Sequence, residues 1–311
     1  MRFGDQRDFF YGFENVGVTA ELDYTIFAGD GADEVRLSYV TSDVTIRGNA
    51  GDDALHAGLG TNELRGGKGN DTLTSQGGNG LLSGGNGEDR IESFDLLSEG
   101  GNRLFGGDGD DNMISAGGGF ADGGSGDDEI YAGGAENEIH GGSGNDIIEV
   151  AEGNSRMYGG QGNDRMRSLG DNAEIRGNAG NDMIAAIGDY NELRGGKGLD
   201  FIGAYGRSND VWGGKGADYF QFVVSNFEGT ATIHDFSAGE DLFGFATAVG
   251  GLDAPQTTED AYDYFHETAT QVGNDVSWDN GNGFSVLIKG VTLDDFSLAT
   301  FDTWDFFELQ G

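Results

Sequence analysis

The sequence predicts an all-β solenoid, in which short parallel strands and tight turns alternate along a coiled chain. Three observations predict this fold class. Glycine accounts for 60 of the 311 residues, which is about 19% of the chain against a usual share near 7%. A glycine-rich segment of eight residues returns in most steps after 18 residues, and apolar residues return every nine. Repeats of this length indicate stacked coils, each of which contacts its neighbours.

The repeated segment reads Gly-Gly-x-Gly-x-Asp-x-apolar. Clear copies occupy residues 66–73, 84–91, 106–113, 123–130, 141–148, 159–166, 195–202 and 213–220, and looser copies occupy 28–35, 48–55 and 177–184. Glycines in the first, second and fourth positions permit backbone angles that are closed to other residues, so we expect a turn over the first six positions. The Asp in the sixth position ends this turn.

The apolar positions predict the interior. Within each run they are nine residues apart, which fits a six-residue turn and a three-residue strand whose central side chain points inward. Two such units complete one coil of 18 residues. We expect a thin aliphatic core formed by Ile46, Leu55, Leu64, Leu73, Leu82, Ile91, Leu104, Met113, Ile130, Ile139, Ile148, Met157, Met166, Ile175, Ile184, Leu193, Ile202, Val211 and Phe220.

Charge and cysteine content limit the partners. The chain holds 55 acidic and 17 basic residues, a formal net charge of −38, and no Cys. This charge excludes unassisted binding to nucleic acid or to an anionic membrane. The lack of Cys excludes disulfides and thiolate metal sites, so oxygen-ligand metals such as calcium suit the many carboxylates. No apolar stretch is long enough for a membrane span, and no transmembrane segment is predicted.

Over residues 28–220 the repeats resemble the RTX, or haemolysin-type, calcium-binding nonapeptide. The resemblance implies a right-handed parallel β-roll, or β-helix, of about ten 18-residue coils that holds about 7–10 calcium ions. It implies that each ion lies between equivalent turns of successive coils and takes an Asp carboxylate from both, with turn carbonyls for which we expect the second and fourth positions. The implied metal residues are Asp33, Asp53, Gly67, Gly69, Asp71, Gly85, Gly87, Asp89, Gly107, Gly109, Asp111, Gly124, Gly126, Asp128, Gly142, Gly144, Asp146, Gly160, Gly162, Asp164, Asn178, Gly180, Asp182, Gly196, Gly198, Asp200, Gly214, Gly216 and Asp218.

Two steps in the repeat are irregular. Asp89 and Asp111 are 22 residues apart, with an insertion at 94–100, and Asp33 and Asp53 are 20 residues apart. We expect irregular spacing to cost some of the calcium sites, and the sites at these two steps are the ones in doubt.

The opposite turns depart from the RTX pattern. At the position of the Asp they carry a neutral amide, in Asn62, Asn102, Asn137, Asn191 and Asn209. Asn tolerates left-handed backbone and can hydrogen-bond to its copy in the next coil. We therefore expect calcium along one edge only and a ladder of Asn along the other.

One outward face could bind a ligand. Before the calcium turns, outward positions hold basic and aromatic residues, among them Arg156, Tyr158, Arg176, Arg194 and Trp212. Such a sheet could bind an extended polysaccharide, with rings under the sugars and Arg on carboxylates. The alternative is a solvated surface on which Glu and Arg pair between adjacent strands.

The two ends read differently from the repeats. Residues 1–27 hold several aromatic residues and predict an N-terminal cap, or a segment that docks onto a larger partner. Residues 221–311 alternate in a way that predicts antiparallel strands. They resemble the C-terminal region that follows RTX repeats, which implies a cap and a type I secretion signal read by type I secretion machinery. The N-terminus lacks the features of a cleaved signal peptide.

Catalytic motifs are missing from the sequence. His266 begins HETAT, which lacks the second His of the zinc motif HExxH, and no GxSxG elbow occurs. The resulting hypothesis is a secreted or cell-surface calcium-binding protein without catalysis, with a structural or adhesive role, which folds on calcium binding after type I secretion. Two alternatives remain: a polysaccharide-binding module of, or accompanying, a carbohydrate-active enzyme, and side-by-side self-assembly of the rolls, as in a surface layer.

Overall fold

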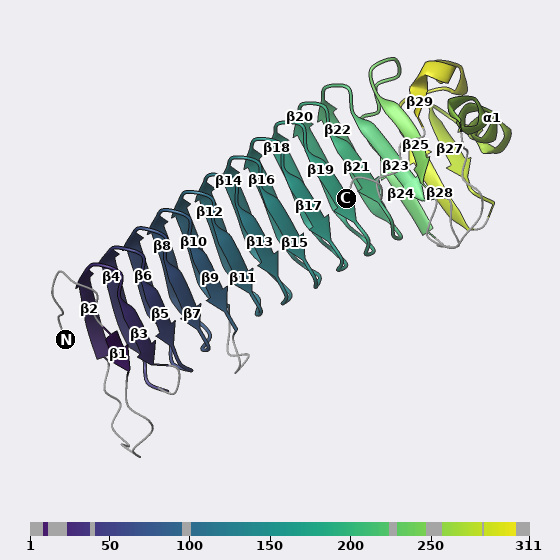
Figure 1. The fold of residues 1–311 in the computed structure, drawn as a ribbon. Coiled ribbons are helices and arrows are strands. Elements are labelled where there is room, and N and C mark those ends of the chain that lie inside the picture. Colours follow the sequence, from purple (N-terminus) through teal and green to yellow (C-terminus); the bar gives the residue numbers. More distant parts are fainter. Residues whose placement is uncertain are drawn as a thin grey trace. The chain divides into compact units, whose positions relative to one another are not determined.

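The computed structural model describes residues 9–11, 24–37, 41–94, 101–223, 229–246, 257–281 and 283–302. The chain divides into two compact units, Met1–Arg156 and Met157–Gly311. In both units the repeats form a parallel β-solenoid, which confirms the predicted fold class (Figure 1).

The first unit contains two sheets whose strands alternate along the chain. The odd-numbered strands are β1 (Phe9–Tyr11), β3 (Glu34–Leu37), β5 (Ala54–Ala57), β7 (Thr72–Ser75), β9 (Arg90–Ser93), β11 (Asn112–Ser115), β13 (Glu129–Ala132) and β15 (Ile147–Val150). The even-numbered strands are β2 (Tyr24–Asp30), β4 (Val44–Ala50), β6 (Glu63–Lys68), β8 (Leu81–Asn86), β10 (Arg103–Asp108), β12 (Phe120–Ser125) and β14 (Glu138–Ser143). Strand β16 (Arg156–Gln161) contains the boundary between the units.

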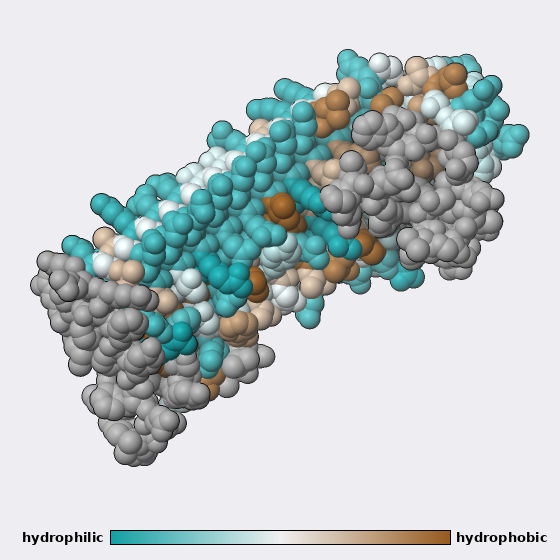
Figure 2. Space-filling view, in the orientation of Figure 1, coloured by the Kyte–Doolittle hydropathy of each residue, from teal (hydrophilic) through white to brown (hydrophobic). Residues whose placement is uncertain are grey.

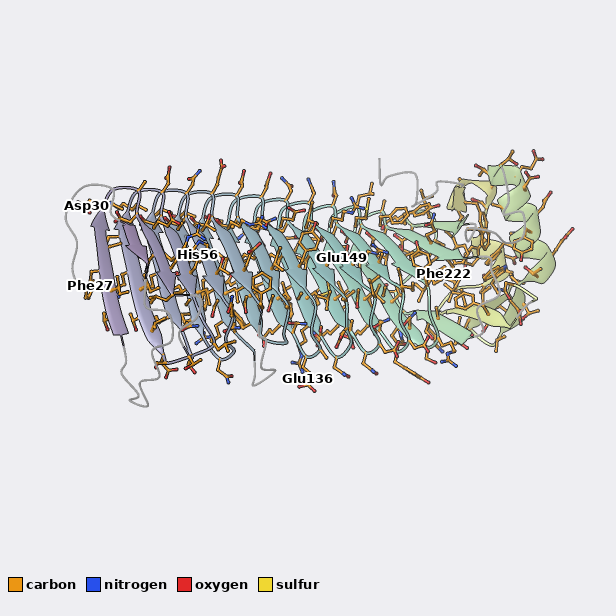
Figure 3. The ribbon with its side chains drawn as sticks, turned by 60° about the horizontal axis from the view of Figure 1, so that its bottom comes forward. Phe27, Asp30, His56, Glu136, Glu149 and Phe222 are labelled. Atoms are coloured by element: carbon orange, nitrogen blue, oxygen red, sulfur yellow. The ribbon has the colours of Figure 1, made fainter. Side chains whose placement is uncertain are left out.

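Successive coils stack in register. Gly67 pairs with Gly85, Gly85 with Gly107, and Gly107 with Gly124, so one repeat position lies above its copy in the next coil. All neighbouring strands of the first unit pair in parallel, as in β3 with β5 and β4 with β6. The RTX turns therefore line one edge of the coils and the intervening turns line the other. Figure 3 shows Asp30 on the RTX edge and Glu136 on the opposite edge.

The predicted aliphatic core is confirmed. Every one of the 19 predicted residues, from Ile46 to Phe220, is at most 1% exposed. Each fully buried aliphatic side chain contributes about 1.5–3 kcal/mol relative to an exposed one. Over the described residues the face shown in Figure 2 is mostly hydrophilic, with separate apolar spots.

The second unit also contains two sheets of mainly parallel strands. Its odd-numbered strands are β17 (Arg165–Ser168), β19 (Met183–Ala186), β21 (Phe201–Ala204), β23 (Tyr219–Val223), β25 (Leu242–Ala246) and β29 (Phe301–Asp302). Its even-numbered strands are β18 (Glu174–Ala179), β20 (Glu192–Lys197), β22 (Asn209–Lys215), β24 (Gly229–Ile233), β26 (Thr270–Val272), β27 (Asp275–Asp279) and β28 (Phe284–Ile288). The helices are α1 (Thr258–Thr268) and two short 3-10 turns, Leu293–Asp295 and Leu298–Thr300.

The expectation of antiparallel strands after residue 220 is only partly right. Strands β24, β25, β28 and β29 still pair in parallel with their neighbours. Among the described strands, antiparallel pairing is limited to β26 with β27 and β27 with β28. Inward and outward side chains alternate in the same way in parallel and in antiparallel strands, so the sequence pattern does not distinguish the two. Large side chains such as Phe243, Phe265 and Trp278 are buried in the core at this end. The sequence also did not predict α1, in which the Thr257 side chain accepts a hydrogen bond from the backbone N–H of Asp260.

At the other end the coils begin earlier than residue 28. Strand β2 starts at Tyr24, and β1 pairs in parallel with β3, so part of the proposed 1–27 cap already belongs to the two sheets. Residues 1–8, 12–23 and 303–311 lie outside the described residues, and with them the rest of the proposed N-terminal cap and the end of the proposed secretion signal. Within the described part of the chain no helix has the length and apolar character that crossing a membrane requires.

Candidate metal centre

The Asp residues of the RTX turns form a hydrogen-bonded ladder. In the first unit the backbone N–H of one Asp donates to Oδ1 of the Asp in the next coil, at 2.7–2.9 Å, from Asp33 through Asp146. In the second unit the same ladder runs from Asp164 through Asp182 and Asp200 to Asp218 at 2.9–3.0 Å. All these Asp residues are at most 3% exposed. One carboxylate oxygen of each rung is therefore used by the backbone.

The second carboxylate oxygen, Oδ2, lacks a hydrogen-bond donor at many of these Asp residues. The buried Oδ2 oxygens of seven rungs accept no hydrogen bond in the described part of the chain; they belong to Asp53, Asp71, Asp89, Asp111, Asp128, Asp182 and Asp200. A buried carboxylate oxygen without a partner is costly. A row of such oxygens at one strand spacing fits a row of cations.

A backbone oxygen lies beside five of the seven Oδ2 atoms that lack a donor, those of Asp53, Asp111, Asp128, Asp182 and Asp200. A methyl group on the first glycine of a turn would lie 2.1–2.3 Å from Oδ2 of that turn's Asp, as at Gly48, Gly123 and Gly195. At these glycines the same methyl group would lie 2.5–2.7 Å from the carbonyl oxygen of the first glycine in the next coil. Two oxygens from successive coils thus face one small space. The sequence analysis missed these carbonyls, although ten of the eleven repeats carry glycine in the first position.

Burial makes this row of carboxylates hard to ionise. It raises the pKa of Asp53, Asp71, Asp111, Asp128 and Asp200 from 3.8 to about 7, and that of Asp89, Asp182 and Asp218 to about 6. The hydrogen bond from the preceding rung lowers the pKa, for example at Asp128, while neighbouring carboxylates such as Asp111 raise it. A divalent cation between the rungs would offset both the burial and the repulsion.

The remaining ligands have to come from the backbone. In the described residues no three His, Asp or Glu side chains gather into a metal-binding group. Calcium accepts carbonyl oxygens together with carboxylates in a flexible geometry, whereas zinc prefers His and Cys. The Asp ladder with its adjacent carbonyls therefore fits calcium.

The second and fourth turn positions adopt the conformation that glycine allows. The predicted glycines, from Gly67 and Gly69 to Gly214 and Gly216, have φ between 109° and 138°, and Asn178 has φ 77°. Their carbonyls stack on the next coil: the Gly67 oxygen would lie 2.2 Å from a methyl group on Gly85. Asn, which tolerates left-handed backbone, can replace the second glycine, as Asn178 does, but other side chains would be strained and crowded at these positions.

The irregular steps do not interrupt the ladder. Asp33 donates to Asp53 and Asp89 to Asp111, each at 2.8 Å, as in the regular steps. Gly85 also stays paired with Gly107 across the 22-residue step. The extra residues lie between the RTX turns, at 38–40 and 95–100, outside the described residues, so the turns themselves keep their register.

The ladder has one more rung than the sequence predicts. The N–H of Asp218 donates to Oδ1 of Asp241 at 2.9 Å, and Oδ2 of Asp241 accepts from the Ser237 N–H at 2.7 Å. Asp235 accepts from the N–H groups of Gly213 and Gly214 at 2.9 and 3.1 Å. Both oxygens of Asp241 are thus used, so this Asp terminates the ladder. The repeat gave no signal for this rung, because the segment HDFSAGED at 234–241 no longer follows the 18-residue spacing.

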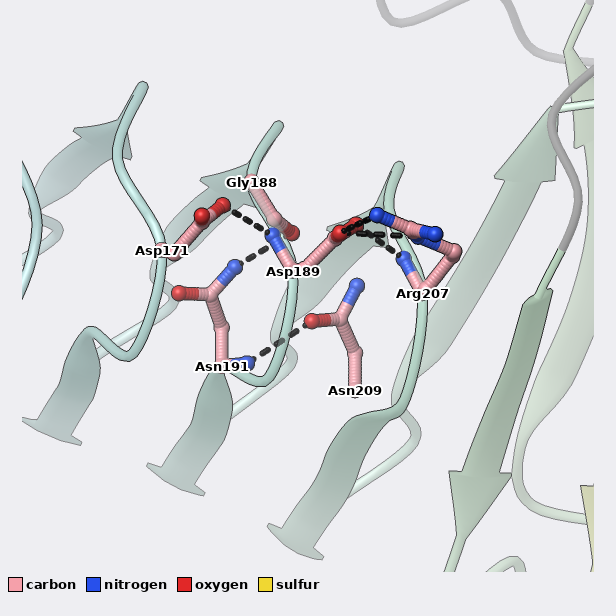
Figure 4. Close-up of polar contacts among 6 residues, drawn as sticks. All are labelled: Asp171, Gly188, Asp189, Asn191, Arg207 and Asn209. Carbon is pink, nitrogen blue, oxygen red and sulfur yellow. Dashed lines mark hydrogen bonds and ion pairs between the residues drawn. The ribbon is translucent and has the colours of Figure 1, made fainter.

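The opposite edge uses amides in the same place (Figure 4). Oδ1 of Asn191 accepts from the Ala173 N–H at 2.7 Å, and the Asn191 N–H donates to Oδ1 of Asn209 at 2.8 Å. The Nδ2 of Asn191 donates to the Gly188 carbonyl in its own turn at 2.6 Å, and Asn62 likewise donates to Gly58 at 2.8 Å. The Nδ2 of Asn102 instead donates to the Gly77 carbonyl of the preceding coil at 2.9 Å. The predicted Asn ladder is thus present in part: Oδ1 of Asn102, Asn191 and Asn209 accepts from the backbone of the preceding coil, whereas Oδ1 of Asn62 and Asn137 accepts no hydrogen bond in the described part of the chain. These rungs join side chains to backbone rather than one amide side chain to another.

The five candidate ligand-binding residues lie on the outward face of β16, β18, β20 and β22. Arg156 belongs to the first unit and the other four to the second. In the second unit the Arg194 guanidinium lies 3.9 Å from the centre of the Trp212 ring, and His234 stacks on Trp212 at 4.1 Å. Arg176 lies 6.0 Å from the centre of the Tyr158 ring. Arg194 and His234 thus occupy the stacking positions around Trp212 that a sugar would need.

The charges on this face pair mainly within strands. Arg194 pairs with Glu192 and Arg65 with Glu63, both at 2.7 Å and two residues apart. The Arg47–Glu63 contact, at 3.8 Å, joins neighbouring strands. The expected pairing between adjacent strands is therefore the minor pattern, because residues i and i+2 of one strand point to the same side.

Comparison with known proteins agrees with this site. The family model of the RTX calcium-binding nonapeptide repeat (4 copies) matches residues 41–64, 56–91, 114–148, 122–157, 140–173 and 158–186. No curated protein matches the chain. A solved structure with a partial match is the crystal structure of the extracellular lipase LipA from Serratia marcescens, with 19% identity and a TM-score of 0.24. The match covers 64% of this chain and 39% of the lipase chain. The chain therefore carries RTX calcium-binding nonapeptide repeats, wound into a parallel β-solenoid.

Proposed function

We propose that the chain is a secreted calcium-binding protein whose ions lie along the RTX edge only. Each ion binds between successive turns, to Asp carboxylates and to turn carbonyls, including those of the first glycines. The observation that carries the proposal is the row of buried Oδ2 oxygens without partners, because among the described residues of the amide edge only the separate oxygens of Asn62 and Asn137 lack a donor. About eight divalent ions along that row would add roughly +16 to the formal charge, against −38 for the chain.

Calcium binding would be coupled to folding. Without the ion, the folded coils must hold neighbouring buried carboxylates and order many glycines, and both costs oppose folding. Sites of the extracellular class fill at millimolar calcium, so the repeats would stay unfolded in a calcium-poor cytosol and fold outside the cell. This order of events suits export through a type I channel, in which the chain is threaded unfolded.

The role that suits such a protein is structural or adhesive, at the cell surface or in the surrounding matrix. Within each unit the coils stack in register, and the outward charges of the second unit largely pair with one another. A catalytic role has no support from the sequence motifs. Cell-surface or matrix components are therefore the expected partners, besides calcium.

The test is a calcium titration of chelated protein, followed by circular dichroism, with bound ions counted by native mass spectrometry. We expect a cooperative gain of strand signal and 7–10 bound ions per chain, as calcium of the extracellular affinity class implies. Strand content that is the same in chelator and in millimolar calcium would contradict coupled folding. A count near twice that range would contradict the restriction to one edge.

A second candidate is binding of an extended polysaccharide, on a part of the outward face away from the five candidate residues named above. On β10, β12 and β14 the rings of Phe105, Phe120 and His140 lie next to one another at 5.4 Å and are half-exposed. Arg103 lies 5.2 Å from the Phe105 ring centre. Retardation in gels that contain acidic or neutral polysaccharides, lost in Phe120→Ala, would support this role; equal mobility with and without glycan would exclude it for the glycans tested.

A further inference from the structure

The outward face of the odd-numbered strands changes character in the second unit. On β5, β9 and β13 the third residue is half-exposed: His56, Glu92 and Tyr131. On β19, β21 and β23 the equivalent residues are Ala185, Gly203 and Gln221, and all three are buried. Gln221 is 0% exposed although it alternates with the inward-facing Phe220 and Phe222.

Apolar side chains border this buried strip. Met183 and Phe201 pack against Ala185 and Tyr205, and Phe201 stacks on Tyr219 at 4.7 Å. Tyr205 is 6% exposed and reaches across Gly203, where a methyl group would lie 2.3 Å from its hydroxyl. The Tyr205 hydroxyl donates to Oε1 of Gln221 at 3.0 Å. We call Met183, Ala185, Phe201, Gly203, Tyr205 and Gln221 the outer apolar cluster.

We propose that residues 303–311 of this chain cover the outer apolar cluster. Strand β29 ends at Asp302 and pairs with β25, which pairs with β23, so the chain leaves the described region beside the same sheet. The centre of the cluster, β19, lies four strand spacings from β29. This distance is about 19 Å, and nine extended residues span up to about 30 Å.

The chemistry of the segment matches the surface. Residues 303–311 read TWDFFELQG, with four large apolar side chains and two carboxylates. The cluster is bordered on β17 by Arg165 and Arg167, whose positive charges complement Asp305 and Glu308. Residues 224–228 are tied between β23 and β24, and 247–256 between β25 and α1, so neither is a free end of the described region.

This docking would make the segment depend on the fold of the coils. The outer apolar cluster exists only when β19, β21 and β23 are stacked, so residues 303–311 would be exposed on an unfolded chain and covered on the folded solenoid. The inference goes beyond the calcium row, because it concerns the opposite side of the sheets from the core and needs no metal ligand.

The test measures hydrogen exchange of peptides that contain residues 303–311, by mass spectrometry, in the full chain at saturating calcium. We expect at least roughly tenfold slower exchange than in the free synthetic peptide of the same sequence. Ala185→Arg places a long charged side chain in the cluster and should restore exchange to within about twofold of the free peptide. The matched control is Ile114→Arg, at the equivalent outward position of β11, which should leave the protection unchanged.

Bound calcium, counted for each variant, shows whether the coils still fold. Rapid exchange of 303–311 in the unaltered chain, or full protection in folded Ala185→Arg, would overturn the proposal. If Ala185→Arg does not fold, a chain that ends at Asp302 takes its place and should show faster exchange over residues 201–206, reversed by adding the peptide 303–311. If exchange over residues 201–206 does not respond to the truncation, another segment covers the cluster. If protection rises with protein concentration, a second copy of the chain covers it. Either result would overturn the proposal.

Discussion

The two edges of the solenoid are joined by the same kind of hydrogen bond, and their Asp and Asn side chains differ in one atom. On the RTX edge Oδ1 of Asp128 accepts from the N–H of Asp111, and on the other edge Oδ1 of Asn191 accepts from the N–H of Ala173. The remaining atom of Asn191 is an amide nitrogen, which donates to the Gly188 carbonyl in its own turn. The remaining atom of Asp128 is an oxygen, and it has no donor.

This difference shows that the stacking of coils and the binding of metal depend on different atoms of the same side chain. Stacking of the coils needs an acceptor at Oδ1, which both residue types supply. Calcium needs oxygens that no backbone donor has already used. Among the described residues the Asp edge supplies them in successive coils, whereas the Asn edge leaves only the separate Oδ1 atoms of Asn62 and Asn137. The fold itself therefore allows either edge to be neutral, while the choice of Asp or Asn decides where ions can bind.

The largest expected effect is that of removing calcium. All rungs of the Asp edge lose their cation at once, and the buried carboxylates, with pKa values near 6–7, oppose folding at neutral pH. We expect loss of most strand signal in circular dichroism in chelator at pH 7.5, and its return with calcium. An intact second unit in chelator, seen by hydrogen exchange of residues 174–223, would mean that the Asn edge and the core suffice without the ion.

A single exchange of Asp for Asn should have opposite effects with and without calcium. In Asp128→Asn the backbone bond from Asp111 can persist, but the ions on either side lose a carboxylate. An ion held at a hundredfold of its dissociation constant contributes about 2.7 kcal/mol, so we expect a loss of that order in calcium and one or two fewer bound ions. In chelator the same variant should be more stable than the parent, because a buried charge is gone. Chemical denaturation in both buffers measures the two signs; equal signs would contradict the role assigned to Oδ2.

The reciprocal exchange tests the other edge. Asn191→Asp replaces the donor to Gly188 with an oxygen and puts a negative charge beside Asp171 and Asp189 (Figure 4). We expect a loss of about 1–3 kcal/mol in the free energy of unfolding, with the ion count unchanged. A gain of one ion would show that a carboxylate alone creates a site and that the Asn edge has the required carbonyls.

The space beside Oδ2 can be tested without touching a carboxylate. In Gly123→Ala the new methyl group would lie 2.2 Å from Oδ2 of Asp128 and 2.5 Å from the Gly141 carbonyl. Gly118→Ala is the matched control in the neighbouring turn on the Asn edge, where the methyl group would lie 2.2 Å from the Ala135 carbonyl. We expect both variants to lose about 1–3 kcal/mol from overpacking, but only Gly123→Ala to lose bound calcium. Native mass spectrometry at limiting calcium distinguishes them, and equal ion counts would remove the first glycine from the site.

Much of this comparison was predictable from the sequence, because it depends on spacing. The 18-residue step, the inward residues from Ile46 to Phe220 and the Asp and Asn rows all follow from periodicity, which fixes which side chains point inward and which turns stack. The role of the first glycines was not predictable, because sequence does not show which carbonyl lies beside Oδ2.

The C-terminal region shows where the pattern fails. After Phe220 the spacing becomes irregular, and strand alternation does not distinguish a parallel from an antiparallel neighbour, so β24 and β25 were assigned the wrong direction. Asp241 was missed for the same reason: it lies 23 residues after Asp218, yet it occupies the next rung. The stacking of Arg194 on Trp212 depends on side-chain conformation, which periodicity does not set.

The smallest expected effect is that of mild acid, and its sign follows from the raised pKa values. Asp53, Asp71, Asp111, Asp128 and Asp200 have pKa values of about 7 in the folded coils against an ordinary 3.8, so folding without metal takes up protons between these values. The stabilisation from protonation is complete below pH 3.8 and is lost as the pH rises through 7. The metal-free chain should therefore gain stability from pH 7.5 to 5, while the calcium midpoint moves to higher concentration, because protons and calcium compete for the same oxygens. Asp128→Asn should weaken both trends and Asn191→Gln neither, and a calcium midpoint that does not depend on pH would mean that these buried carboxylates are not the ligands.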